Sequence, residues 1–367
     1  MKYALTRLAQ AVVILIVVTF LTFWMQTLLP GNPCIVATGG LTSDELVAKC
    51  EVDLKVGENV FVRYADWGTN FISGDLGESY VNGRTVWDDL KQRFPPTGFL
   101  FLYSQVVALG VAVPGGIWAA YMAGRKAKRN IPTWLPFAIV GGIVAVSIAL
   151  GTSVFTLILL AIFATVVIQT LRGGAAQDQL VSASAFFLLS VPVVVLAIVG
   201  QWLFAIRWNL YDLSGYTPPS EGLFDHVKSL WLPSVVIGLS LSPVYLRLLR
   251  ADMIQNLQQD FVNVAKAKGM PPSTILLRHV LRPSTLTLLT VAGLNVAQLV
   301  NGAVIVEVLY DVDGMGSYLV SKFLGREFIV VQTLVALIAT IFVLANLAVD
   351  LFYGVVDPRV RVERSKG

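Results

Sequence analysis

The sequence predicts an all-α protein with several membrane-spanning helices. Hydrophobic residues make up 56% of its 367 positions and charged residues only 14%, whereas about a quarter of a soluble domain is charged. Several apolar stretches have the length of roughly 17–25 residues that a helix needs to cross a bilayer. The segments between these stretches also alternate between basic and acidic excess, as the orientation of a membrane protein requires.

The first half of the chain contains up to four predicted spans. The first, 8–29, follows Lys2 and Arg7; a cleaved signal peptide is the alternative, but no A-x-A cleavage site follows the long apolar run. A polar region up to 98 separates it from the second span at 99–122. The stretch 134–171 is uncharged over 38 residues. One helix of that length would measure about 57 Å against a hydrocarbon core of about 30 Å, so we expect it to fold back near 151–153 as two short spans.

The second half contains four predicted spans, at 180–206, 232–250, 284–307 and 329–352, with a kink at Pro192. With the N-terminus inside, the inner segments hold 17 Lys and Arg against 5 Asp and Glu, and the outer segments hold 10 against 16. Because an excess of Lys and Arg marks the cytoplasmic side, we expect eight spans with both termini cytoplasmic. Six spans with 134–171 as a re-entrant hairpin give the same sidedness and are the alternative.

The predicted spans and their orientation divide the chain into six regions. They are an N-terminal helix 1–29, an extracytoplasmic region 30–98, a helix 99–122, a basic loop plus hydrophobic hairpin 123–179, core helices 180–352 with a cytoplasmic loop 251–283, and a cytoplasmic tail 353–367. The basic run 125–129 is expected to face anionic lipid, which accounts for part of the net charge of +4 without any nucleic-acid partner.

No catalytic or metal-binding motif is evident. The chain lacks a G-x-x-x-x-G-K-[ST] phosphate loop, an H-E-x-x-H motif and a G-x-S-x-G motif, and its two histidines lie far apart. The spans contain almost no ionisable groups, since Glu307 and Asp350 lie at span ends, where we expect carboxylates with local hydrogen-bond partners. Ion-coupled transporters usually need such groups near the midplane. Any uphill transport would therefore draw its energy from a partner.

The cytoplasmic loop contains the stretch NVAKAKGMPPSTILLRHVLRPS at 263–284, which predicts two short helices at an angle. Gly269 suits the left-handed residue that ends the first helix, with Met270 making the accompanying apolar contact. Pro271 and Pro272 prevent continuation, and Ser273 is expected to cap a second helix that runs to about 282. The first helix is expected to present one apolar stripe, formed by Ile254, Leu257, Phe261, Val264 and Ala265. Such an elbow could lie on lipid or dock onto a soluble partner, and physical reasoning alone leaves both open.

Five motifs give the chain a resemblance to a known family. They are FVNVAKAKGMPPSTILLRHVLR at 261–282, LLPGNP at 28–33, FISGDLGESYVNGRTVWDDL at 71–90, NGAVIVEVLYDVDGMG at 301–316 and NLAVDLFYGVVDPRVR at 346–361. With these motifs the chain resembles the permease subunits of binding-protein-dependent ABC importers, in the dipeptide/oligopeptide/nickel branch and most closely its B-type subunit. Asn263, Val264 and Ala265 stand where the family's E-A-A occurs, and Asp313 replaces a usual proline. The resemblance covers about 1–122 and 180–362, so the hairpin in 123–179 is expected to be an insertion.

The resemblance implies an ABC type I importer-like transmembrane domain in a bacterial plasma (inner) membrane. The implied function is a non-catalytic pore subunit for di- or oligopeptides; a nickel chelate, haem or a glycan fragment is the alternative cargo. Its partners would be a homologous C-type permease, two ATPase subunits or domains that bind ATP and Mg²⁺, and an extracytoplasmic substrate-binding protein, while this chain binds no cofactor. A membrane scaffold or sensor subunit is the alternative from another class. The implied ATPase-coupling residues are Asn263, Val264, Ala265, Lys266, Ala267, Lys268, Gly269, Met270 and Pro271.

Two further groups of residues are candidates for specific roles. Asn295, Gln298 and Asn301 follow one another at i, i+3 and i+6 along the seventh span, where they could line a wet path or form hydrogen bonds between helices. Cys34 and Cys50 lie in the first outer segment, where oxidation is permitted. A disulfide between them would contribute roughly 3 kcal/mol on the loop-entropy account; two free thiols are the alternative.

Overall fold

The structure, a computed structural model, describes residues 2–28, 57–79, 83–123, 188–213 and 215–356, together with positions 34, 47–48, 51–52, 55, 81 and 185. Regular structure within these ranges is helical, apart from one isolated antiparallel bridge between Glu78 and Thr85. The helices are α1 (Lys2–Thr27), α4 (Val60–Ser73), α5 (Val86–Ala123), α9 (Val193–Gly200), η1 (Gln201–Arg207), α10 (Leu223–Asn256), α11 (Asp260–Ala267), α12 (Pro272–Thr274), η2 (Ile275–Val280), α13 (Leu281–Leu294), α14 (Val296–Leu309), α15 (Met315–Leu324) and α16 (Phe328–Val356).

Four of the described helices are long and apolar enough to cross a membrane. They are Thr6–Thr27, Val86–Ala123, Leu223–Asn256 and Phe328–Ala348, and they correspond to the predicted first, second, sixth and eighth spans. The hydrophobic stretch 134–171, the basic run 125–129 and the tail from 357 lie outside the described residues. The number of spans, eight or six with a hairpin, therefore stays a prediction.

The helix that contains the second predicted span begins before that span. Helix α5 starts at Val86, although the polar region was expected to reach 98. The Thr85 hydroxyl accepts a hydrogen bond from the Asp88 amide at 3.3 Å and donates one to its carboxylate at 2.8 Å, which satisfies donors that a helix start leaves free. Pro95 and Pro96 lie inside helix α5, so the helix does not begin after these prolines.

Two other spans are interrupted. The chain is not helical at 191–192 and Pro192 lies directly before α9, so the disruption predicted at Pro192 is present as a break in the helix and not as a kink. The predicted seventh span is divided at Asn295 into α13 and α14. Residues 201–207 wind as a π-helix, a form that is frequent at functional positions.

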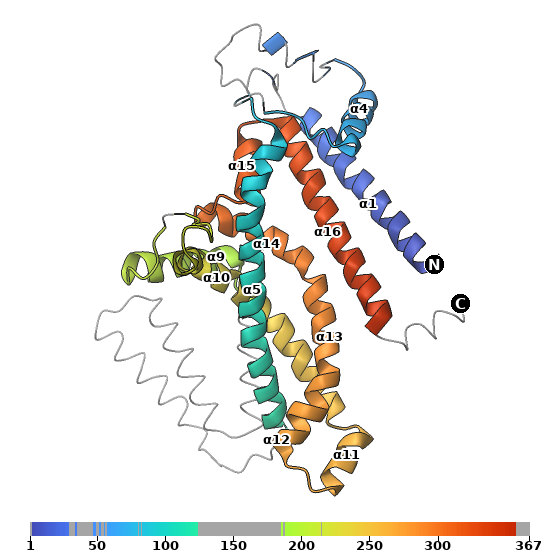
Figure 1. Cartoon of the computed structure of the whole chain (residues 1–367), viewed down its shortest axis with the longest axis vertical. Coiled ribbons are helices and arrows are strands. Elements are labelled where there is room, and N and C mark those ends of the chain that lie inside the picture. The colour runs from blue at the N-terminus through green and yellow to red at the C-terminus, as the bar shows by residue number, and fades with distance from the viewer. Residues whose placement is uncertain are drawn as a thin grey trace. The chain divides into compact units, whose positions relative to one another are not determined.

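The helices fall into two compact units. The first consists of Met1–Gln105, Val193–Ile237 and Thr290–Gly367. In it α1 and α16 lie side by side (Figure 1), and Gln332 of α16 donates a hydrogen bond to the carbonyl of Thr19 at 2.8 Å. Helix α4 packs on α1 through aromatic rings, including Phe61 on Phe20 with a centroid distance of 5.5 Å.

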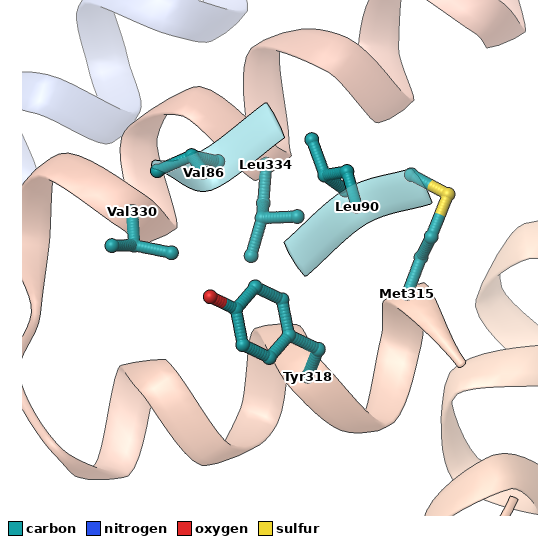
Figure 2. Close-up of a cluster of buried hydrophobic side chains, with 6 residues drawn as sticks. All are labelled: Val86, Leu90, Met315, Tyr318, Val330 and Leu334. Atoms are coloured by element: carbon teal, nitrogen blue, oxygen red, sulfur yellow. The ribbon is translucent and has the colours of Figure 1, made fainter. Parts of the chain in front are cut away.

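Buried apolar side chains join three helices of the first unit. Figure 2 shows Val86 and Leu90 from the start of α5, Met315 and Tyr318 from α15, and Val330 and Leu334 from α16. All six are at most 5% exposed. This cluster fixes α15 against the N-terminal ends of α5 and α16.

A buried carboxylate holds the turn between α14 and α15. Glu307 is fully buried and accepts hydrogen bonds from the amides of Gly316 at 2.7 Å and Ser317 at 3.0 Å, and from the Thr97 hydroxyl at 2.6 Å. The Glu307 oxygens thereby supply acceptors to amides that a helix N-terminus leaves without intrahelical partners. A Cβ atom on Gly314 would lie 2.4 Å from Cδ of Glu307, so this motif needs glycine at 314. The expectation that Glu307 has hydrogen-bond partners is confirmed.

The second unit consists of Val106–Pro192 and Gly238–Leu289. It contains the C-terminal part of α5, the C-terminal part of α10, and the elbow from α11 to the start of α13. A Cβ atom added to Gly115 would lie 2.7 Å from Leu246, and one added to Gly116 would lie 3.0 Å from Leu249. The two glycines therefore let α5 and α10 approach closely within this unit.

Candidate functional site

The elbow of the second unit begins with α11, an eight-residue helix that ends in a tightly bonded stop. Gly269 has φ of +73°, its amide donates to the carbonyl of Lys266 at 2.9 Å, and the Met270 amide donates to that of Ala265 at 3.2 Å. These two bonds define a Schellman motif, which ends a helix with a left-handed residue. The predicted role of Gly269 is confirmed. No atom lies within 4 Å of a Cβ placed there, so glycine is required for its backbone conformation.

The apolar residues of α11 are divided between two faces. Val262 and Ala265 are buried, and the helix lies against η2 (Figure 1), whose Ile275, Leu276 and Val280 are also buried. Phe261 and Val264, one turn apart on another face, remain 42% and 54% exposed. The prediction of one continuous apolar stripe is wrong, because α10 ends at Asn256 and α11 starts only at Asp260.

The chain restarts as a helix without the predicted side-chain cap. Pro271 occupies the N-cap position in an extended conformation and Pro272 occupies the first helical position. Proline is favoured there because its missing N–H would have no intrahelical acceptor. Ser273 therefore lies inside the first turn, and its assignment as the cap is wrong. The helix continues through η2 into α13 without a further break.

A buried hydrogen bond fastens the end of α10 to the restarted helix. The Asn256 side-chain amide donates to the Ser284 hydroxyl at 2.9 Å, and this hydroxyl donates to the carbonyl of Val280 at 3.0 Å. Ser284 is fully buried. The sequence analysis did not single out these residues, since two polar side chains 28 positions apart give no periodic signal. Together with the packing of α11 on η2, this bond holds the two arms of the elbow together.

The exposed surface of the elbow is apolar and basic. The sequence contains no Asp or Glu from 261 to 306, and Lys266, Lys268, Arg278 and Arg282 are all exposed. Leu277 adds a further exposed apolar side chain on η2. Besides its Lys and Arg residues, the surface carries His279 and the exposed Asp260 at the start of α11, and neither has a nucleophile beside it in the sequence. Its chemistry matches an apolar groove with an acidic rim on another protein.

The other sequence-predicted residues are only partly described. Asn295 lies at the break between α13 and α14, and its amide nitrogen is buried without a hydrogen-bond partner among the described residues. Gln298 and Asn301 belong to α14, but their side chains lie outside the described part of the chain. Whether the three polar residues line a wet path or form hydrogen bonds between helices therefore stays a prediction. Cys34 is buried and forms a disulfide, so the alternative of two free thiols is wrong; Cys50, the other of the two cysteines in the sequence, lies outside the described residues.

The sequence matches two models of one known family of membrane proteins. The family model described as "binding-protein-dependent transport system inner membrane component" matches residues 157–362, and the model of the corresponding N-terminal region matches 1–100. The chain belongs to this family. As such an inner-membrane component it is a multi-pass protein of the plasma membrane and a permease subunit of ABC importers, and the predicted resemblance is confirmed. The family match begins at 157, so it reaches further toward the N-terminus than the start at 180 that the motifs alone predicted.

Several curated proteins resemble this permease over almost their whole length. A protein of Sinorhizobium fredii described as a probable peptide ABC transporter permease, y4tP, is 27% identical over 359 residues, which cover 98% of this chain and 99% of the relative. The dipeptide transport system permease protein DppB of Escherichia coli strain K12 is 28% identical over 363 residues, with 98% and 99% coverage. DppB of Alkalihalophilus pseudofirmus is 26% identical with the same coverage.

Proposed function

We propose that this chain is the pore-forming subunit of an ATP-driven importer of di- and oligopeptides, and that α11 transmits the motion of partner ATPases to it. A homologous C-type permease, two ATPase subunits or domains and an extracytoplasmic binding protein complete the assembly. ATP and Mg²⁺ are bound by the ATPases. When ATP closes the ATPase dimer, the elbows move with it and the helices open outward to receive the peptide. Hydrolysis then resets the assembly.

The observation that carries the proposal is the two-faced packing of α11. A helix that transmits force needs one face fixed to its own chain and another available to the partner. Val262 and Ala265 provide the fixed face, and Phe261 and Val264 provide the available one. The Schellman stop at Gly269 sets the length of the helix, so movement of α11 is passed to the segments that hold it.

The peptide substrate is supported by the relatives. The proteins from three organisms quoted above are named as peptide or dipeptide permeases, and each aligns with 98% of this chain. In a strain that lacks other peptide importers, we therefore expect uptake of labelled dipeptide to depend on this chain. Dipeptide uptake that is unchanged by deletion of the chain would refute the substrate assignment.

Val264→Glu tests the coupling role. It puts a carboxylate on a surface whose proposed partner is an apolar groove with an acidic rim, while the isolated chain tolerates it because the side chain is half exposed. We expect loss of dipeptide uptake and of ATPase co-purification, with an unchanged amount of permease in the membrane. A charged residue at Ala265 would be a poorer test, because that position is buried.

Gln258→Glu is the matched control for this experiment. It introduces the same charge in the exposed turn before α11, outside the apolar face, and should leave uptake and assembly unchanged. If the Val264→Glu protein still imports dipeptide, or loses import while retaining the ATPase with unchanged affinity, α11 is not the docking helix.

A further inference from the structure

The helix that leaves the elbow has one buried row of side chains. η2 and the start of α13 form a continuous helix, in which Leu276, Val280, Ser284 and Leu288 are all buried. A spacing of four drifts slowly around an α-helix, which has 3.6 residues per turn, and the wider turn of the π-helix offsets part of that drift. The four side chains therefore stay on one face, which packs against the chain itself.

The opposite face of this helix is exposed and changes from basic to apolar along its length. It carries Arg278, Arg282, Leu286 and Leu289, all of them exposed, the two leucines by 49% and 50%. Two positions along an α-helix correspond to a rotation of about 200°, so this row lies opposite the buried one. The helix thus has an outer face with a positive end and an apolar end.

The two arginines of this face are neighbours without a partner in the described part of the chain. Neither guanidinium group forms an ion pair or a hydrogen bond there, and the sequence contains no Asp or Glu from 261 to 306. Residues four positions apart on a helix have Cβ atoms about 6 Å from each other. Arg278 and Arg282 can therefore both reach one anion of the size of a phosphate.

The exposed face crosses the predicted boundary of the membrane. The seventh predicted span begins at 284, and the charge count places this end on the cytoplasmic side. At 1.5 Å per residue, Arg282 and Arg278 lie about 3 and 9 Å before the span, whereas Leu286 and Leu289 lie inside it. The headgroup layer is about 5–8 Å thick on each side of a bilayer, and the flexible stems of arginines let their charges enter it.

An anionic phospholipid matches both ends of this face. Its phosphate accepts paired hydrogen bonds from guanidinium groups, and its acyl chains cover apolar side chains inside the bilayer. A soluble ATPase could meet the arginines but would not reach Leu286 and Leu289 within the hydrocarbon. A neighbouring membrane helix could cover the leucines, but the two positive charges before them require an anion at the depth of the headgroups. The cytoplasmic leaflet supplies that anion in its acidic lipids.

We propose that Arg278 and Arg282 bind the phosphate of an anionic phospholipid of the cytoplasmic leaflet, whose acyl chain lies along Leu286 and Leu289. The lipid holds the helix behind the elbow at a fixed depth, while the exposed face of α11 stays available to the ATPase. The site depends neither on the peptide cargo nor on docking through α11. Its failure would therefore leave the proposed function untouched.

The test uses the assembled importer in nanodiscs of phosphatidylcholine that contain a small fraction of phosphatidylglycerol with a photoactivatable acyl chain. After irradiation, mass spectrometry measures the labelling of 283–289. Each arginine near an anionic headgroup contributes about fivefold in affinity, so Arg278→Gln/Arg282→Gln should reduce the labelling about 25-fold. The same photoactivatable chain on phosphatidylcholine should label this segment far less in the wild type. Equal labelling by the two lipids, or labelling that the double variant does not reduce, would overturn the proposal.

A matched control removes the same charge elsewhere in the chain. Arg207 and Lys228 are exposed and belong to a segment predicted to lie outside, so Arg207→Gln/Lys228→Gln should leave the labelling of 283–289 unchanged. An equal loss with this pair would count against a local site. Unlabelled phosphatidylglycerol should compete with the probe and glycerol phosphate should not, because it lacks the acyl chains. Displacement by glycerol phosphate, or no labelling of the segment at all, would also refute a lipid site.

Discussion

Truncating the exposed face of α11 should weaken ATPase binding by an amount that the structure sets. Phe261 and Val264 are 42% and 54% exposed, and full burial of such side chains is worth roughly 1.5–3 kcal/mol each. Burying only the exposed half on docking therefore contributes about 1 kcal/mol per residue, or about 2 kcal/mol together. Since 1.4 kcal/mol is tenfold in affinity, the double variant Phe261→Ala/Val264→Ala should bind the ATPase about 30-fold more weakly.

The assay is the affinity of purified ATPase for the permease in nanodiscs, measured by biolayer interferometry. The double variant should keep its unfolding temperature, because the removed atoms are largely exposed in the free chain. A matched pair, Val106→Ala/Val111→Ala, removes side chains 62% and 40% exposed on α5 of the same unit and should leave the affinity unchanged. Wild-type affinity in the α11 double variant, or an equal loss in the α5 pair, would refute the reasoning.

Three further substitutions test local features through the unfolding midpoint in detergent. Gly269→Ala should destabilise the elbow by about 1–2 kcal/mol because its left-handed backbone disfavours a Cβ, and Gly269→Asn should cost less; equal midpoints for wild type and both variants would contradict this. Gly314→Ala should cost about 1–3 kcal/mol by overlap with Glu307, and its φ of −101° excludes a backbone cause; an unshifted midpoint would show that the turn can yield. Ser284→Ala should cost about 1–3 kcal/mol, since it leaves the Asn256 amide unpaired, whereas Thr285→Ala on the exposed side should cost less.

Local chemistry made part of the elbow predictable. Gly269 is followed by two prolines, and this order predicts a left-handed stop, which the structure contains. The prediction of one apolar stripe is wrong because the helix breaks between Asn256 and Asp260. A break of three residues resets the helical phase, so residues spaced for one face of a continuous helix are divided between two. The prediction of Ser273 as the cap is wrong because Pro272, a favoured first residue, starts the helix two positions earlier than that cap implies.

Contacts between distant segments were beyond sequence reasoning. Glu307 was expected to find hydrogen-bond partners, but Thr97 lies 210 positions away, and no periodicity links the two. Arg93 and Asp313 are brought together in the same way, with Arg93 Nε 3.1 Å from Asp313 Oδ1. Separately these residues look like ordinary solvated charges at the ends of spans. Their common location depends on α15 packing against the start of α5, through the buried cluster of Figure 2.

The carboxylate of Glu307 also makes the turn between α14 and α15 observable by amide hydrogen exchange. The first amides of a helix usually exchange fast because they lack intrahelical acceptors. In α15 the first three amides instead donate to side chains of other helices. The Met315 amide donates to the Thr97 hydroxyl at 2.8 Å, and the amides of Gly316 and Ser317 donate to Glu307. Deuterium should therefore enter this first turn only when α15 separates from α5 or α14. The three amides therefore form a native probe of that opening, and the measurement needs no added label.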